Sequence, residues 1–240
     1  MSLFYTRALS PARPLGTELE FSETELGLRD MLPIGDRAQY LYQKPIRRYP
    51  TTMDKNQLIW TEQERKQVFN SKVFSVWESY CKAPESQKNR ESQVFTVIDA
   101  RDWVIVVPVI DSPDGKQFIM VWQWRHGSQS LSLEFPGGVM EQGESPDETA
   151  IRELYEETGY KPQKIEKIGE FSPNPAIMSN KVHFFLAENL TGNGKQNLDE
   201  NEYVEISLVN TNEVIHGMGK KPYIHALMGT ALALYRQRIP

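Results

Sequence analysis

The chain has 240 residues, of which 39% are hydrophobic and 25% are charged, a composition typical of a folded globular protein rather than a disordered one. Its formal net charge of −5 disfavours non-specific binding to nucleic acids, which a basic surface would favour. The single cysteine, Cys81, excludes an intrachain disulfide and fits a reducing compartment, and the longest apolar run, residues 103–110, is too short to span a bilayer. We therefore expect a cytoplasmic protein that binds neither a membrane nor nucleic acid.

The first 66 residues have no sustained hydrophobic period, because prolines and arginines are scattered through them. Residues 18–29 and 61–68 could each form a short helix, the second with Thr61 as N-cap and Glu64 three residues later. We interpret residues 1–66 as an N-terminal extension of unknown role, such as a dimerisation arm, a lid or a small added domain. Residues 67–240 are expected to form the main domain.

Strand patterns dominate the rest of the chain. Apolar residues, alternating or continuous, predict strands at residues 73–80, 93–98, 103–110, 118–124, 130–135, 165–171, 181–187 and 202–208. Helices are predicted at residues 210–218 and 222–237, and the polar loop at residues 192–201 is expected to be mobile. Many strands with one central and one terminal helix indicate an α+β fold, in which a mixed sheet is layered between helices.

The central helix has clear start and stop signals. Ser145 is predicted as its N-cap, Pro146 as its first residue, and Glu148 completes a capping box. Gly159 is predicted to end it, with Pro162 just beyond.

One stripe of this helix is predicted to be buried, and it consists of Ala150, Ile151, Leu154, Tyr155 and Thr158. Glu153, Glu156 and Glu157 are placed on the opposite, exposed face, within a patch about 6 Å long. Carboxylates at the negative end of a helix dipole cost about 0.3–1 kcal/mol each, so an acidic cluster there indicates a functional site. Oxygen ligands without histidine or cysteine suit Mg²⁺ or Mn²⁺. The alternative interpretation of the three glutamates is a solvated acidic surface.

The whole stretch around this helix resembles the Nudix box. The matching positions are Gly138, Glu144, Arg152, Glu153, Leu154, Glu156, Glu157, Gly159 and Tyr160. An aliphatic residue is usual where this chain has Tyr160. The resemblance covers residues 72–238 and implies an α/β/α sandwich.

The resemblance also implies roles for these residues. Glu153, Glu156, Glu157 and the Gly137 carbonyl would bind the divalent metal, with Glu153 and Glu157 taking part in catalysis. Four further residues would hold the loop and helix together: Gly138, Glu144, Arg152 and Gly159.

Three residues outside the box, Arg125, Glu134 and Pro175, resemble the ADP-ribose pyrophosphatase branch of the family. Arg125 at a strand end suits bidentate phosphate binding, and Glu134 would orient the loop or bind substrate. Pro175 and Asn180 would bind the substrate as well. Ala176 and Asn180 depart from the residues common in that branch, so GDP-mannose or another nucleoside diphosphate sugar is an alternative substrate.

The resemblance places a general base on the loop before the last strand, where Glu200 aligns best and Glu202 is the alternate. It implies Mg²⁺- or Mn²⁺-dependent hydrolysis of the pyrophosphate bond in a small nucleoside diphosphate, by a homodimer. A ligand sensor without activity is the alternative of another class, but such versions usually lose the metal glutamates, which are all present here.

Overall fold

The computed structural model describes residues 55–84, 92–200 and 202–238. The helix predicted at residues 18–29 lies outside this part of the chain. Residues 56–240 belong to one compact unit, which contains two sheets. The predicted division into residues 1–66 and 67–240 stays a prediction.

A three-stranded antiparallel sheet comes first in the described chain, after the short 3-10 helix η1 (Lys55–Leu58). Its strands are β1 (Thr61–Asn70), β2 (Phe74–Lys82) and β3 (Gln93–Ala100). The prediction of a helix at residues 61–68 is wrong, because this segment pairs with β2 along its length. The Glu62 side chain binds Arg65 and Ser79, the second a residue of β2, so cross-strand pairing prevails over the local capping pattern.

The second sheet has six strands, in the order β6-β5-β4-β8-β7, with β9 paired to β5. These strands are β4 (Trp103–Ser112), β5 (Gly115–Arg125), β6 (Ser130–Glu134), β7 (Tyr160–Phe171), β8 (Val182–Gly192) and β9 (Val204–Asn210). β4 and β8 run parallel and the other pairs are antiparallel, so the sheet is mixed as predicted.

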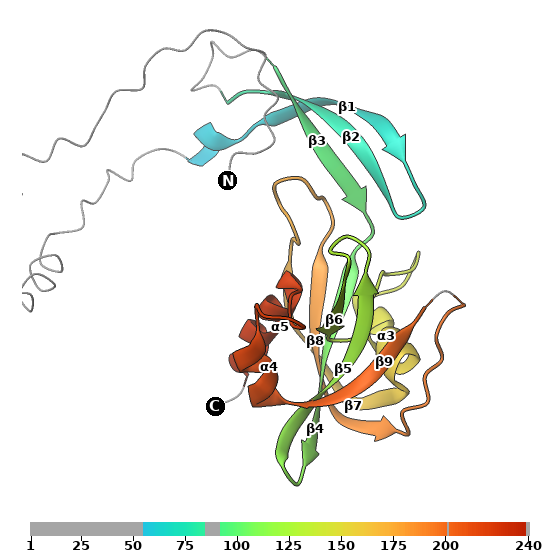
Figure 1. The fold of residues 1–240 in the computed structure, drawn as a ribbon. Helices are drawn as coiled ribbons and strands as arrows, with labels where there is room; N and C mark the ends of the chain where they lie inside the picture. The colour runs from blue at the N-terminus through green and yellow to red at the C-terminus, as the bar shows by residue number, and fades with distance from the viewer. Residues whose placement is uncertain (1–54, 85–91, 201, 239–240) are drawn as a thin grey trace, which may run out of the picture. The chain divides into compact units, whose positions relative to one another are not determined.

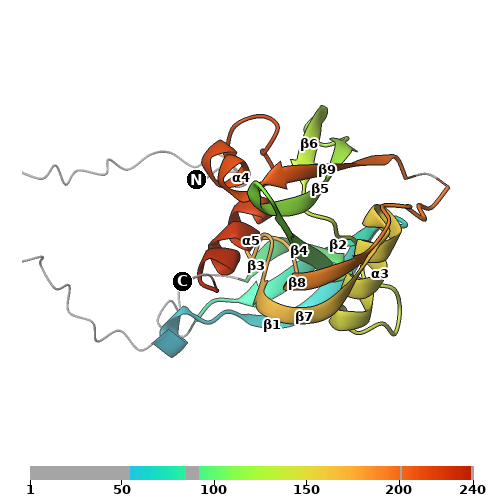
Figure 2. The ribbon, with the colours of Figure 1, turned by 90° about the horizontal axis from the view of Figure 1, so that it is seen from below.

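Helices cover both faces of this sheet (Figures 1 and 2). α3 (Pro146–Thr158) lies on one side, and α4 (Thr211–Gly217) and α5 (Ala226–Arg236) lie on the other. Alternate residues of β4 therefore enter two cores: Val104 and Val106 pack under α3, whereas Ile105, Val107 and Val109 pack toward α4 and α5. Burial on both faces explains why this strand is almost entirely apolar. The prediction of an α/β/α sandwich is confirmed.

One predicted helix boundary differs from the structure. Pro162, just beyond the predicted end of the central helix, pairs with Leu190 inside the β7–β8 ladder. The terminal helix was expected from residue 222, yet it begins at Ala226. The Pro222 carbonyl instead accepts a hydrogen bond from Leu133 N of β6 at 3.2 Å, so the residues before α5 are fixed to the sheet. Among the described residues, no helix is long and apolar enough to cross a membrane.

Candidate active site

α3 begins and ends as its sequence predicts. Ser145 is the N-cap; its hydroxyl accepts from Glu148 N at 3.3 Å, and the Glu148 carboxylate accepts from Ser145 N at 2.9 Å. Pro146 is the first helical residue. Gly159 ends the helix with a φ of 70°. A Cβ there would also lie 2.5 Å from the backbone of Lys195, so glycine is required for two reasons.

The buried face of α3 differs from the predicted one. Ala150, Leu154 and Thr158 are fully buried, but Ile151 and Tyr155 are exposed. Glu153 and Glu157 take their place, with only 8% and 4% of their surface exposed. The prediction that these two glutamates lie on an exposed face is therefore wrong. The buried positions 150, 153, 154, 157 and 158 still form one helical stripe, displaced toward the acidic side.

The glycine loop covers this acidic flank. Val104 N of β4 donates to Gly138 O and Val106 N to Pro136 O, both at 2.9 Å, which holds the loop against the sheet. A Cβ on Gly138 would lie 2.4 Å from Glu153 Oε1, and a Cβ on Gly137 would lie 2.2 Å from the Val104 carbonyl. Glycine is required at Gly137, where the neighbour is fixed backbone, whereas at Gly138 a larger residue would displace the Glu153 carboxylate.

Arg152 compensates part of the negative charge. Its Nε and Nη2 donate to the two oxygens of Glu144 at 2.8 and 2.9 Å, and Nη1 donates to Glu153 at 2.9 Å and to Glu156 at 3.0 Å. The Arg152 hydrogen bonds lower the pKa of Glu144 to about 2, against the smaller effect of burial. Arg152 and Glu144 thus join the loop to the helix, as expected for residues with a structural role.

Burial disfavours the ionised form of the Glu153 and Glu157 carboxyl groups. Burial raises the pKa of Glu153 to about 7, against the opposing charge and hydrogen bond of Arg152. Burial likewise raises the pKa of Glu157 to about 8, although Gly137 N donates to its Oε2 at 2.9 Å. The negative charge of Glu202 adds to both shifts. A bound cation would relieve this cost.

The oxygen donors at this position fit a hard divalent cation. Glu153 and Glu157 supply carboxylates, and the Gly137 carbonyl accepts no hydrogen bond from any described residue. Glu156 is paired with Arg152, which would have to release it. In the part of the chain that the structure describes, no three histidine, cysteine, aspartate or glutamate side chains already converge as a complete ligand set.

A cavity of about 790 Å³ opens beside the glycine loop, and its lining includes Gly137, Gly138, Arg125, Glu134 and Glu202. Arg125 ends β5 and binds Glu134 with two hydrogen bonds, Nε to Oε1 at 3.0 Å and Nη2 to Oε2 at 2.7 Å. Five of the residues predicted from the sequence therefore come together in one cavity.

Two predicted substrate-binding residues do not line this cavity. Pro175 is exposed in the loop between β7 and β8. Asn180 is buried, and its Nδ2 donates to the Arg101 carbonyl at 3.1 Å. Their part in binding stays a prediction.

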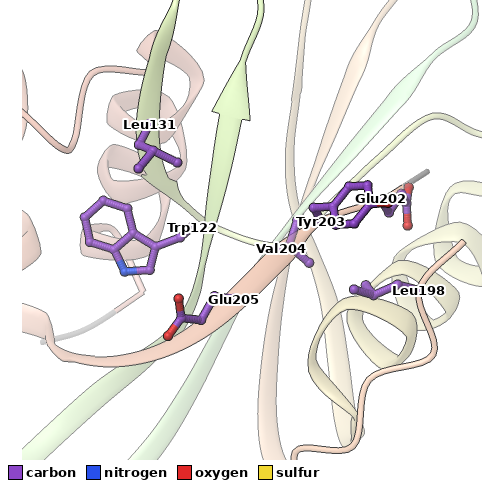
Figure 3. Close-up of a pocket in the computed structure, with 7 residues that line it drawn as sticks. All are labelled: Trp122, Leu131, Leu198, Glu202, Tyr203, Val204 and Glu205. Carbon is purple, nitrogen blue, oxygen red and sulfur yellow. The ribbon is translucent and has the colours of Figure 1, made fainter. Parts of the chain in front are cut away.

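The loop before β9 carries both candidate bases, and only one of them reaches the cavity. Glu202 lines the 790 Å³ cavity and a neighbouring one of about 590 Å³, which Figure 3 shows with Tyr203 beside it. Glu200 is exposed and lines neither. The loop is fixed to the end of α3, because Asn197 N donates to Glu156 O at 2.8 Å and Gln196 Nε2 donates to Glu157 O at 2.7 Å.

One further cavity residue, His225, has no local signal in the sequence. His225 lies just before α5, 91 positions after Glu134, yet its Nδ1 is 3.0 Å from Glu134 Oε2. From the sequence, His225 is known only to lie near the start of the terminal helix, and a histidine at that position does not by itself indicate a function.

A sandwich fold with a buried acidic helix under a glycine loop defines a hydrolase domain of the Nudix class. The NUDIX domain family model matches residues 100–227, which include the whole site. The chain belongs to the Nudix family and is a Nudix hydrolase.

Individual relatives agree with this assignment. The chain is 35% identical to the ADP-ribose pyrophosphatase of Bacillus subtilis over 152 residues, which are 63% of this chain and 78% of the relative. It is 27% identical to the methanol dehydrogenase activator of Bacillus methanolicus, over 65% of this chain and 81% of that one. A crystal structure of an ADP compounds hydrolase shares the fold with a TM-score of 0.64 and 24% identity, over 75% of this chain and 93% of that one.

Proposed function

We propose that this protein hydrolyses the pyrophosphate bond of ADP-ribose or a related nucleoside diphosphate sugar, with Mg²⁺ or Mn²⁺ as cofactor. The products would be a nucleoside monophosphate and a sugar phosphate. The observation that carries the proposal is the pair of buried glutamates, Glu153 and Glu157, beside a cavity that also contains Arg125. The relative named as an ADP-ribose pyrophosphatase supports the substrate class.

Each residue then has a chemical task. Glu153, Glu157, Glu156 and the Gly137 carbonyl hold the metal. When bound, the cation would neutralise diphosphate charge and lower the pKa of a water molecule. Arg125 binds phosphate oxygens through its remaining nitrogen, Nη1, to which no described side chain is bonded.

The loop glutamate completes the reaction. Glu202 accepts a proton from the attacking water, because it lines the cavity and Glu200 does not. The water oxygen bonds to one phosphorus as the bridging P–O bond breaks, and the other phosphate leaves without a covalent intermediate on the enzyme.

The test is turnover of a panel of nucleoside diphosphate sugars, including ADP-ribose and GDP-mannose, by the purified full chain with Mg²⁺. Glu157→Gln is expected to lower kcat by at least about 100-fold, since it removes a metal ligand. The variant should remain folded, because an amide of the same shape replaces a buried charge. Glu141→Gln, at an exposed glutamate, is the matched control.

No turnover of any compound in the panel would refute the proposed substrate class. Full activity of folded Glu157→Gln would refute the assigned metal site while leaving the substrate class intact.

A further inference from the structure

Two side chains in the cavity wall share the buried carboxylate of a third. Glu134 is only 2% exposed, and Arg125 binds both of its oxygens. His225 Nδ1 approaches Oε2, the oxygen that also accepts from Arg125 Nη2, at 3.0 Å. Nδ1 is buried and has no hydrogen-bond partner among the described residues, so its approach to Oε2 is a close polar contact.

The backbone fixes His225 on both sides of this contact. Three residues earlier, the Pro222 carbonyl accepts from Leu133 N at 3.2 Å. Three residues later, Met228 Sδ accepts from Phe135 N at 3.1 Å, in a fully buried contact. Leu133 and Phe135 flank Glu134 in sequence, so two anchors align the imidazole with the carboxylate. The position of His225 is therefore set by the fold.

The polar groups of the cavity wall show what a second partner adds. Arg125 alone already neutralises Glu134, so the burial of this carboxylate does not itself require His225. His225 nevertheless lines the cavity, and its second ring nitrogen, Nε2, has no hydrogen-bond partner among the described residues. The other titratable side chains that line the cavity are His126, Glu202 and Tyr203.

We propose that His225 is a substrate-binding residue, whose imidazole is held on Glu134 beside Arg125 and contacts the phosphate oxygens of the nucleoside diphosphate. This inference rests on the proposed function, because it assigns a further residue to that same site. Arg125 and His225 bind one end of the diphosphate, and the glycine loop with the acidic helix lies against the other.

The first experiment compares His225→Asn with His225→Lys in steady-state kinetics on the best substrate of the panel. Asparagine keeps a donor for Glu134 but lacks the second ring nitrogen that would contact the phosphate, so KM is expected to rise about tenfold while kcat changes less than about threefold. Lysine supplies a longer side chain with donors for a phosphate and should bring KM back to within about threefold of the native value. His216→Asn, on the exposed side of α4, is the matched control and should change neither constant.

A second measurement does not depend on turnover. Calorimetry on the metal-free protein is expected to detect AMP binding that weakens about tenfold in His225→Asn, whereas adenosine, which lacks the phosphate, binds both proteins equally. Circular dichroism and thermal unfolding establish that each variant is folded, and His225→Gln replaces His225→Asn if the latter does not fold.

Unchanged KM and AMP affinity in a folded neutral variant would overturn the inference while the native protein still hydrolyses its substrate. Equal loss in the asparagine and lysine variants would assign His225 to packing alone and would overturn it as well. If the native protein hydrolyses none of the substrates, the proposed function is refuted instead. Failure of the proposed function and failure of the His225 inference are therefore distinguishable.

Discussion

The pKa of Glu134 depends on two opposing effects, its burial and its contacts with charged or polar neighbours. Burial on its own would raise the pKa of this carboxyl group, but the His225 and Arg125 contacts prevail and lower it to about 2. Because this value lies below that of a glutamate in the unfolded chain, the ionised group stabilises the fold above pH ~4.5. The contribution is lost as the pH falls from ~4.5 toward ~2.

Glu134→Gln should therefore destabilise the protein in a pH-dependent way. At pH 7 the free energy of unfolding is expected to fall by up to about 3 kcal/mol, which corresponds to the lowered pKa. At pH 2.5 the variant and the native protein should differ far less. Urea unfolding at the two pH values measures this, with Glu141→Gln as an exposed control. An equal loss at both pH values would mean that packing, and not ionisation, is what Glu134 contributes.

At the scale of the element, α3 shows what can and cannot be predicted from local sequence. Its capping box and glycine stop depend on residues close in the chain, and both predictions are confirmed. Its buried face depends on the glycine loop, which covers Glu153 and Glu157 although Ile151 and Tyr155 are more apolar. A prediction from periodicity alone buries the most apolar side chains, and it therefore assigned Ile151 and Tyr155 to the buried face in place of Glu153 and Glu157.

The same distinction applies to the rest of the fold and site. Strands of the large sheet were predicted because their apolar patterns are local, but β1 was mistaken for a helix since its partner strand decides its conformation. Arg125 and Glu134 were singled out from the sequence because they lie near one motif, and the structure places both in the cavity wall, while their role stays a prediction. His225 could not be singled out, because only the pairing of the Pro222 segment with β6 brings it to the cavity.

Gly138→Ala tests the close contact between the glycine loop and α3. The new Cβ would lie 2.4 Å from Glu153 Oε1, the end of a flexible side chain, so the carboxylate must move while the fold adapts. We expect kcat/KM to fall at least about tenfold with a small change in Tm. Gly229→Ala, within α5 and with no neighbour closer than 4.0 Å, should raise stability by about 1 kcal/mol and leave kcat/KM unchanged. Full activity of Gly138→Ala would show that Glu153 does not need its present position.

At the scale of the whole molecule, the three-stranded sheet exposes apolar side chains on one face among the described residues. The register places Phe69, Phe74 and Val76 together at one end of this face, and Val94 lies farther along it, beyond Glu78 and Thr96. Phe69 is 52% exposed and Val94 51%. Exposed apolar side chains on a sheet favour association, so this face is where we expect the predicted homodimer to form.

Sedimentation of the full chain should therefore give twice the 27.7 kDa chain mass. Replacing both Phe69 and Val94 with threonine keeps strand propensity but removes apolar surface, and is expected to shift the protein toward the monomer mass. A native monomer would show the homodimer prediction to be wrong. A double variant that remains dimeric would place the interface on another surface.

The anchoring of the loop before β9 has a consequence for how such enzymes diverge. Gln196 and Asn197 donate hydrogen bonds to carbonyls in the last turn of α3. The chain then passes through Glu200 and Glu202 before β9 begins at Val204. Insertions and replacements between these two fixed ends alter the group that stands over the diphosphate without disturbing the acidic helix. If Glu202 acts as proposed, a few codons in this span can change the reacting group while the acidic helix is inherited unchanged.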